Sequence, residues 1–153
     1  MLKWLINKYW NWRYPEWSDD MVKEYFDKCN NNIWLFQNKL IEDGFKWASD
    51  GLNFSIYTDT FARPNQILAR KFGNCGDFMR LFEAFIKHSG CARKYVQYEL
   101  TYDDALGYHY IMMIWLKDGN VITQSNLQLL SEEAMVTIAK DYDNVKIIDR
   151  WEE

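Results

Sequence analysis

Hydrophobic residues in the first third of the chain recur at intervals of three and four, which is the spacing of α-helices. Ser18, followed by two aspartates, is typical of a helix start, because serine caps exposed N–H groups and acids favour the positive end of the helix dipole. The pattern runs to Cys29 and, after three asparagines, resumes from Ile33 to Ile41. We therefore expect helical structure up to the Asp-Gly turn at residue 43, and the asparagines are a point where it can divide into two helices.

A further helix is predicted to begin near Cys75, where apolar side chains form one continuous helical stripe. The members of this stripe are Phe78, Leu81, Phe82, Phe85 and Ile86. Ser89 and Gly90 predict its end, because glycine readily adopts the left-handed conformation that closes helices.

After this helix the chain becomes rich in β-branched and aromatic residues. Segments 94–102 and 108–116 are predicted strands on this composition. An Asp-Gly pair at 118–119 predicts a tight hairpin, from which residues 120–124 return as a third strand. We therefore expect an antiparallel sheet in the second half of the chain.

The last part of the chain predicts one short helix and one strand. Ser131 is a candidate cap for a helix that ends at Ala139, and residues 145–149 are a candidate strand. The order of the elements predicts an α+β domain with N-terminal helices.

The composition favours a single globular domain over residues 1–153. It is 48% hydrophobic and 26% charged, and its two prolines and seven glycines form no linker-like stretch. The formal net charge of −4 provides no basic surface for nucleic acid. No apolar run reaches the roughly 18 residues that a membrane span needs, and the N-terminus does not resemble a secretory signal, so we expect a cytoplasmic protein.

The cysteines and histidines predict neither a disulfide framework nor a metal site. Cys29, Cys75 and Cys91 are odd in number, and together with His88 and His109 they lack the paired spacing typical of zinc ligands. We expect reduced thiols, no metal and no cofactor.

Aromatic residues make up 18% of the chain, and five of its eight tryptophans fall within the first forty residues. The first interpretation is that these large side chains fill the core of a small domain. The second is an exposed aromatic patch that meets a partner, a substrate or a membrane surface.

Cys75 is the first candidate for chemistry. It is expected in the first turn of its helix, where backbone N–H groups and the positive dipole end stabilise a thiolate. Gly73 and Gly76 leave little bulk beside it to obstruct a substrate carbonyl, and the Cys75 backbone N–H is placed to help stabilise an oxyanion. The simpler interpretation is a buried structural thiol, because most unpaired cysteines behave as small hydrophobic residues.

His109 is the candidate base for Cys75. It shares a strand face with Ile111, and a buried histidine without a partner is costly, so we expect one. Asn126 follows the returning strand, where it can orient the imidazole while His109 takes the thiol proton. A register shift of one residue would put Ser125 in that position.

Several motifs in residues 45–130 together resemble one enzyme family. They are Trp47-Ala48-Ser49-Asp50, Arg63-Pro64-Asn65-Gln66-Ile67-Leu68, Gly73-Asn74-Cys75-Gly76-Asp77-Phe78 and Lys87-His88-Ser89-Gly90-Cys91-Ala92-Arg93, followed by His109 and by Thr123-Gln124-Ser125-Asn126-Leu127. The third is similar to the G-D-C-x-D-aromatic signature of the transglutaminase-like superfamily, which has a papain-like fold. The whole set resembles the bacterial cysteine-proteinase-like branch of that superfamily.

The resemblance implies a papain-like core in which the nucleophile-bearing helix packs on an antiparallel sheet. This core would occupy residues 45–130, after a helical, aromatic-rich part over 1–44 and before a helix and strand over 131–153. The implied catalytic residues are Cys75, His109 and Asn126 or Ser125, with Asn74, Gly76 and Asp77 as oxyanion or loop support and Trp47, Tyr108 and Tyr110 along a substrate cleft. For Asp77, the simpler interpretation is a residue that anchors the loop or complements the helix dipole.

Two departures from the family pattern leave two functions open. Asn74 stands where the family usually has aspartate, and Ser125 stands where it has the catalytic aspartate. The first function is acyl transfer through a Cys75 thioester, as in a peptidase, amidase, deamidase or transglutaminase, acting on a protein or peptide. The alternative is a catalytically inactive binding module for a protein partner. Either would suit a phage or bacterial protein.

Overall fold

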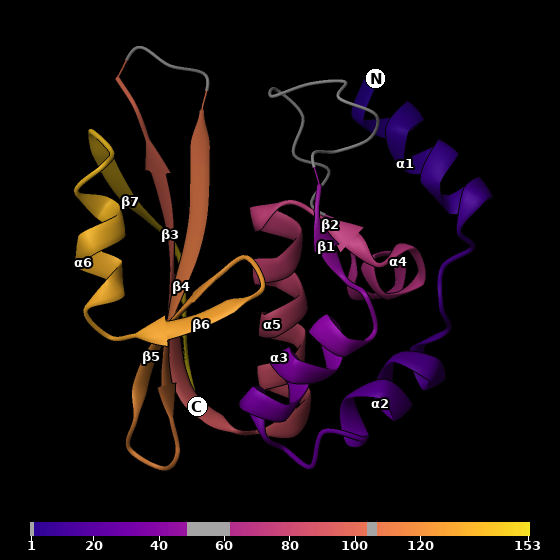
Figure 1. Cartoon of the computed structure of the whole chain (residues 1–153), viewed down its shortest axis with the longest axis horizontal. Helices are drawn as coiled ribbons and strands as arrows, with labels where there is room; N and C mark the ends of the chain where they lie inside the picture. Colours follow the sequence, from indigo (N-terminus) through magenta and orange to yellow (C-terminus); the bar gives the residue numbers. More distant parts are fainter. Residues whose placement is uncertain (1, 49–61, 104–106) are drawn as a thin grey trace.

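The computed structural model describes residues 2–48, 62–103 and 107–153, and it has a mixed α+β fold (Figure 1). Its helices are α1 (Leu2–Arg13), α2 (Asp19–Asp27), α3 (Ile33–Glu42), α4 (Pro64–Arg70), α5 (Cys75–Ser89) and α6 (Ala134–Ala139). Its strands are β1 (Lys46–Trp47), β2 (Phe72–Gly73), β3 (Ala92–Thr101), β4 (Tyr108–Leu116), β5 (Val121–Ser125), β6 (Gln128–Ser131) and β7 (Asn144–Glu152).

Five strands form one antiparallel sheet in the order β6-β5-β4-β3-β7. Helix α5 lies along one face of this sheet and α6 covers the other, while α1 to α4 gather on the far side of α5 (Figure 1). The short strands β1 and β2 form a separate parallel pair beside α4. The predicted antiparallel sheet and its hairpin after Leu116 are confirmed.

The asparagines after α2 divide the predicted helical segment into two helices. Asn30 and Asn31 have φ angles of 52° and 56°, in the left-handed region that asparagine tolerates better than most residues. Asn32 then caps α3 by accepting hydrogen bonds from the backbone N–H groups of Trp34 and Leu35. Ser18 caps α2 in the same way, with its Oγ accepting from Met21 N at 3.2 Å.

Aromatic rings bind α2, α3 and α5 into the core. The rings of Phe36 and Phe85 stack with their centroids 4.2 Å apart, and Phe26 meets both rings edge-on. Phe82 also meets Phe36 edge-on, and all four side chains are at most 3% exposed. Because each buried ring removes a large apolar area from water, this cluster contributes strongly to stability.

Some tryptophans of the N-terminal part fill the core and others are exposed, so both interpretations of their abundance apply. Trp10 is buried and Trp17 packs against the core, so these two contribute to the interior. Trp4, Trp12 and Trp34 are exposed.

Strand alternation separates two sets of side chains on the sheet. Tyr95, Met112 and Ile114 belong to the core that contains α5, and the Tyr95 hydroxyl donates a hydrogen bond to Glu83 of that helix. The alternate residues of β4 therefore project toward the α6 face. His109 is one of them.

The C-terminal part differs from the prediction at both of its elements. Helix α6 begins at Ala134 instead of after Ser131, because Ser131 pairs with Ile122 and extends the sheet as the last residue of β6. Strand β7 continues to Glu152, since its pairing with β3 persists to Lys94. Among the described residues, no helix combines the length and the apolar character needed to cross a bilayer.

Candidate functional site

Cys75 is the first residue of α5, as the sequence predicts, and its side chain is only 6% exposed. Asn74 is the N-cap of the helix. Its side-chain oxygen accepts a hydrogen bond from Asp77 N at 3.0 Å, and the Asp77 carboxylate accepts one from Asn74 N at 3.1 Å. This capping box fixes the backbone on both sides of Cys75, which places the thiol at the positive end of a 15-residue helix.

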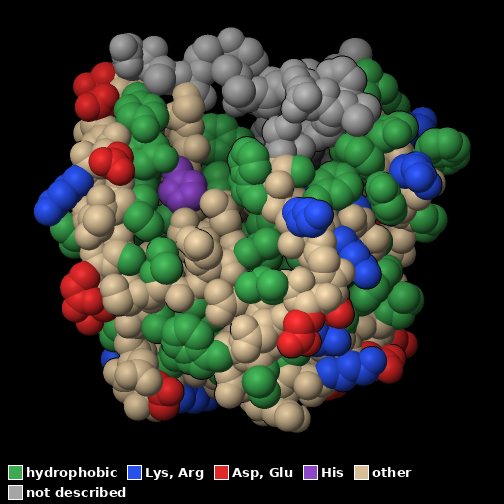
Figure 2. Space-filling model, in the orientation of Figure 1, with side chains coloured by type: hydrophobic (Ala, Val, Ile, Leu, Met, Phe, Trp, Pro, Cys, Tyr) green, Lys and Arg blue, Asp and Glu red, His purple; other side chains and the backbone are tan. Residues whose placement is uncertain are grey.

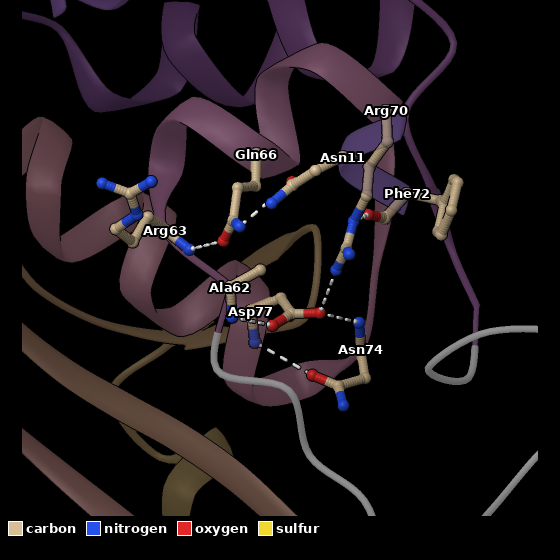
Figure 3. A network of polar contacts seen from close by, with 8 residues as sticks. All are labelled: Asn11, Ala62, Arg63, Gln66, Arg70, Phe72, Asn74 and Asp77. Atoms are coloured by element: carbon tan, nitrogen blue, oxygen red, sulfur yellow. Dashed lines mark hydrogen bonds and ion pairs between the residues drawn. The ribbon is translucent and has the colours of Figure 1, made fainter. Parts of the chain in front are cut away.

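Asp77 anchors the loop that leads to Cys75 (Figure 3). Besides Asn74, its fully buried carboxylate accepts hydrogen bonds from Ala62 N at 2.8 Å and from Arg70 Nη2 at 2.9 Å. The Arg70 Nε in turn donates to the carbonyl of Phe72 at 3.0 Å. Because all these groups are removed from water, Asp77 acts here as a loop anchor that holds three segments together.

Gly73 is needed for this anchor. A Cβ atom at this position would lie 2.8 Å from the Cβ of Asp77, which is closer than side chains approach one another. The sequence-based expectation was that Gly73 leaves room for a substrate carbonyl. The structure instead shows that it leaves room for Asp77.

Trp47 lies beside the same loop. It pairs with Gly73 in the small parallel sheet, and its side chain is 57% exposed. The predicted cleft residue is therefore adjacent in space to the segment before Cys75. The rest of its motif, Ser49 and Asp50, lies outside the described residues.

His109 has the hydrogen-bonding partner that its burial requires. Its Nε2 lies 2.9 Å from the Oγ of Ser125, and the tautomer of the ring decides which of the two groups donates. Burial lowers the pKa of His109 from its ordinary value, because the charged imidazolium is poorly solvated there. The ring is therefore neutral at pH 7, as a general base must be.

Ser125, and not Asn126, is the residue that the structure pairs with His109. Ser125 is the last residue of β5 and lies opposite Ile111, so it shares the strand face that carries His109. Asn126 leaves the strand with a φ of 53°, and its side-chain oxygen is buried without a hydrogen bond in the described part of the chain. The turn conformation thus takes Asn126 out of the register that the sequence-based assignment assumed.

Tyr108 and Tyr110 lie on the opposite face of β4 from His109. Both pack against the core that includes Cys75, their rings are 5.2 Å apart, and the Tyr110 hydroxyl donates to Glu99 at 2.8 Å. Cys75 and the two tyrosines thus belong to one core, whereas His109 and Ser125 form a second group on the other face of β4.

Tyr142 connects the two groups. Its ring lies nearly parallel to that of His109, with centroids 6.2 Å apart, and it also contacts the ring of Tyr102. The pKa of Tyr142 is raised by burial first, then by Tyr102, and also by the charge of Cys75. Tyr142 is thus the residue whose ring neighbours the imidazole and whose pKa also responds to Cys75.

Sequence reasoning missed Tyr142. It lies between α6 and β7, far along the chain from the Cys75 motif, and no local pattern distinguishes it from the other tyrosines. Only the pairing of β7 with β3 brings it to this end of the sheet.

The other two thiols are weaker candidates for a nucleophile. Cys29 and Cys91 are unpaired thiols whose pKa values are raised by burial, which makes them poor nucleophiles at neutral pH. Within the described ranges, no three side chains of the metal-ligating types are grouped.

Comparisons with protein-family models, with curated proteins and with solved structures find no match for this chain. The resemblance to the transglutaminase-like superfamily therefore rests on the motif residues alone.

Proposed function

We propose that this chain is a cysteine-dependent acyl-transfer enzyme with Cys75 as its nucleophile. The observation that carries the proposal is the position of Cys75, which begins α5 directly after the capping box that Asn74 and Asp77 form. Tyr142 supports it, because its ring is nearly parallel to that of His109 and Cys75 contributes to the rise of its pKa. The start of α5 supports the same role for Cys75, since a helix N-terminus favours the thiolate.

The proposed reaction has two halves. The Sγ of Cys75 attacks the carbonyl carbon of a protein or peptide amide, and His109 takes the thiol proton at Nδ1. The C–N bond then breaks, and His109 gives this proton to the leaving amine. Water or a second amine attacks the resulting thioester, which releases the thiol and yields a hydrolysed or transamidated product.

In this reaction Ser125 would act as a positioning residue. In that role its Oγ would accept a hydrogen bond from Nε2–H, which leaves Nδ1 available for the thiol proton. A serine is neutral, so it stabilises the imidazolium less than an aspartate would. The reaction is therefore expected to be slow compared with that of an enzyme that has a carboxylate at this position.

A labelling experiment tests the proposal. The rate of alkylation by iodoacetamide would be measured at each cysteine by mass spectrometry, across the pH range, for the wild type, His109→Ala and His88→Ala. His88 is the matched control, because it is the second histidine of the chain and pairs with Asp27 on the surface. We expect Cys75 to react faster than Cys29 and Cys91 at neutral pH and to lose this advantage only in His109→Ala. Equal reactivity of all three thiols would refute the proposal.

One observation favours the alternative of an inactive binding module. Alternation along β4 directs His109 to the face opposite Cys75, and the third position holds a neutral serine. A module of this kind would use the surface around Trp47 to hold a protein partner and would not need a reactive thiol. The labelling experiment separates the two functions, because the module predicts an ordinary, His109-independent thiol at Cys75.

A further inference from the structure

Helix α1 presents an unusually aromatic face to solvent. Four large side chains on it are exposed: Trp4 by 60%, Leu5 by 48%, Tyr9 by 41% and Trp12 by 76%. Residues four apart in sequence lie above one another on a helix surface. Trp4 and Trp12 therefore share one row, and Leu5 and Tyr9 share the row beside it. A single exposed tryptophan needs no explanation, but a group of exposed aromatic side chains on one helix face is typical of an interaction surface.

Two other side chains of α1 hold the helix in a defined orientation. Trp10 is 9% exposed, and its ring meets Phe72 edge-on with centroids 4.6 Å apart. Asn11 accepts a hydrogen bond from Gln66 of α4 at 3.1 Å, which Figure 3 also shows. The exposed aromatic face is thus turned outward by the fold itself.

The charge of α1 differs from that of the rest of the chain. The helix carries Lys3, Lys8 and Arg13 and no acidic residue, in a chain with a formal net charge of −4. The Nζ of Lys8 lies 4.8 Å from the ring centroid of Trp4, so a cation sits within the aromatic face. Figure 2 shows hydrophobic and basic side chains together over α1, at the upper right of the view.

These features fit a lipid surface better than a protein partner. The exposed face belongs to a single helix at the periphery of the molecule (Figure 1). A protein partner would need a groove that receives this helix, whereas a lipid surface needs none. Tryptophan and tyrosine favour the boundary between acyl chains and headgroups, and lysine can lie among them with its amine at the phosphates.

We propose that α1 docks this protein on an anionic lipid bilayer. Trp4, Leu5 and Trp12 enter the interface, while Lys8 and Arg13 contact lipid phosphates. The acidic remainder of the chain is repelled by the same surface, which leaves α1 as the point of contact. This inference is independent of the chemistry proposed at Cys75.

Co-sedimentation with vesicles tests the proposal. The full chain would be mixed with vesicles of phosphatidylcholine alone or of phosphatidylcholine with phosphatidylserine, at low and high salt. We expect binding only to the anionic vesicles and weakening as salt rises. Trp4→Ala/Trp12→Ala and Lys8→Glu/Arg13→Glu should each weaken it by about an order of magnitude or more.

Two control variants match these changes elsewhere on the surface. Trp34→Ala removes an exposed tryptophan from α3, and Lys23→Glu/Lys146→Glu makes the same change in net charge away from α1. Both should bind as the wild type does, and circular dichroism would show that every variant is folded.

Three outcomes would overturn the proposal. The first is a wild type that sediments with neither type of vesicle. The second is equal loss of binding in the control variants, which would make the effect one of net charge or general hydrophobicity. The third is a wild-type dimer that Trp4→Ala/Trp12→Ala converts to a monomer without any vesicle binding, which would assign the face to self-association.

Discussion

The imidazole of His109 and the hydroxyl of Ser125 lie 2.9 Å apart, between Nε2 and Oγ, at adjacent ends of β4 and β5. This pair places a neutral oxygen where a carboxylate would most strongly stabilise a protonated histidine. Burial lowers the pKa of His109, and the neutral partner limits the expected strength of the base.

Ser125→Asp should raise the pKa of His109 by roughly one to three pH units, because a carboxylate beside the ring favours the imidazolium. The same variant should alkylate faster at Cys75 at neutral pH if the thiol and the imidazole share a proton. NMR titration of the His109 ring measures the first effect, and His88 serves as an internal reference. An unchanged pKa for His109 would contradict the pairing seen in the structure.

The low pKa of His109 predicts how stability depends on pH. Because the folded protein disfavours the charged ring, the folded state binds this proton less readily than the unfolded chain does, whose histidine has the ordinary pKa of 6.5. The stability that His109 contributes is thus present above pH 6.5 and is lost as the pH falls through the folded pKa. Urea unfolding of the wild type and His109→Gln on both sides of this range should show a steeper acid loss in the wild type.

Removing one partner of the Arg70–Asp77 ion pair should be strongly destabilising. Asp77→Ala leaves the Arg70 guanidinium, whose side chain is 2% exposed, without its carboxylate, at an expected cost of about 3–5 kcal/mol in the free energy of unfolding. The double variant Arg70→Met/Asp77→Ala should recover part of this loss, because no unpaired charge remains. Urea denaturation measures both.

The exposed ion pair between Arg63 and Glu16 provides the matched control for that experiment. Its side chains are 63% and 40% exposed, so Arg63→Ala should cost no more than about 1 kcal/mol. Similar losses in Asp77→Ala and Arg63→Ala would show that the buried anchor does not hold the Cys75 loop.

Gly73→Ala should destabilise the protein by about 1–3 kcal/mol, because the added methyl group would press on Asp77. Gly107→Ala is the control, since its added Cβ would come no closer than 3.6 Å to Tyr102. Thermal unfolding would rank the two. If Gly73→Ala were as stable as Gly107→Ala, the close approach of Gly73 to Asp77 would not constrain the loop.

The sequence alone predicted those helices and strands that have a cap, a clear periodicity or a turn motif within their own residues. Ser18 and the helical spacing after it predicted α2, and the stripe from Phe78 to Ile86 predicted α5 with Cys75 in its first turn. The hairpin signal at residues 118–119 predicted the pairing of β4 with β5. Each of these elements is determined by interactions among residues close in sequence. Such interactions do not depend on how the rest of the chain packs.

Packing decided the rest. Ser131 has the chemistry of a helix cap, but its pairing with Ile122 draws it into the sheet and delays α6. The sequence favoured Asn126 as the partner of His109, with Ser125 as the alternative for a register shifted by one residue, and the strand register and the left-handed turn at Asn126 select the serine. Sheet pairing likewise brings Tyr142 beside His109, because contacts between residues distant in sequence form only when the complete sheet assembles.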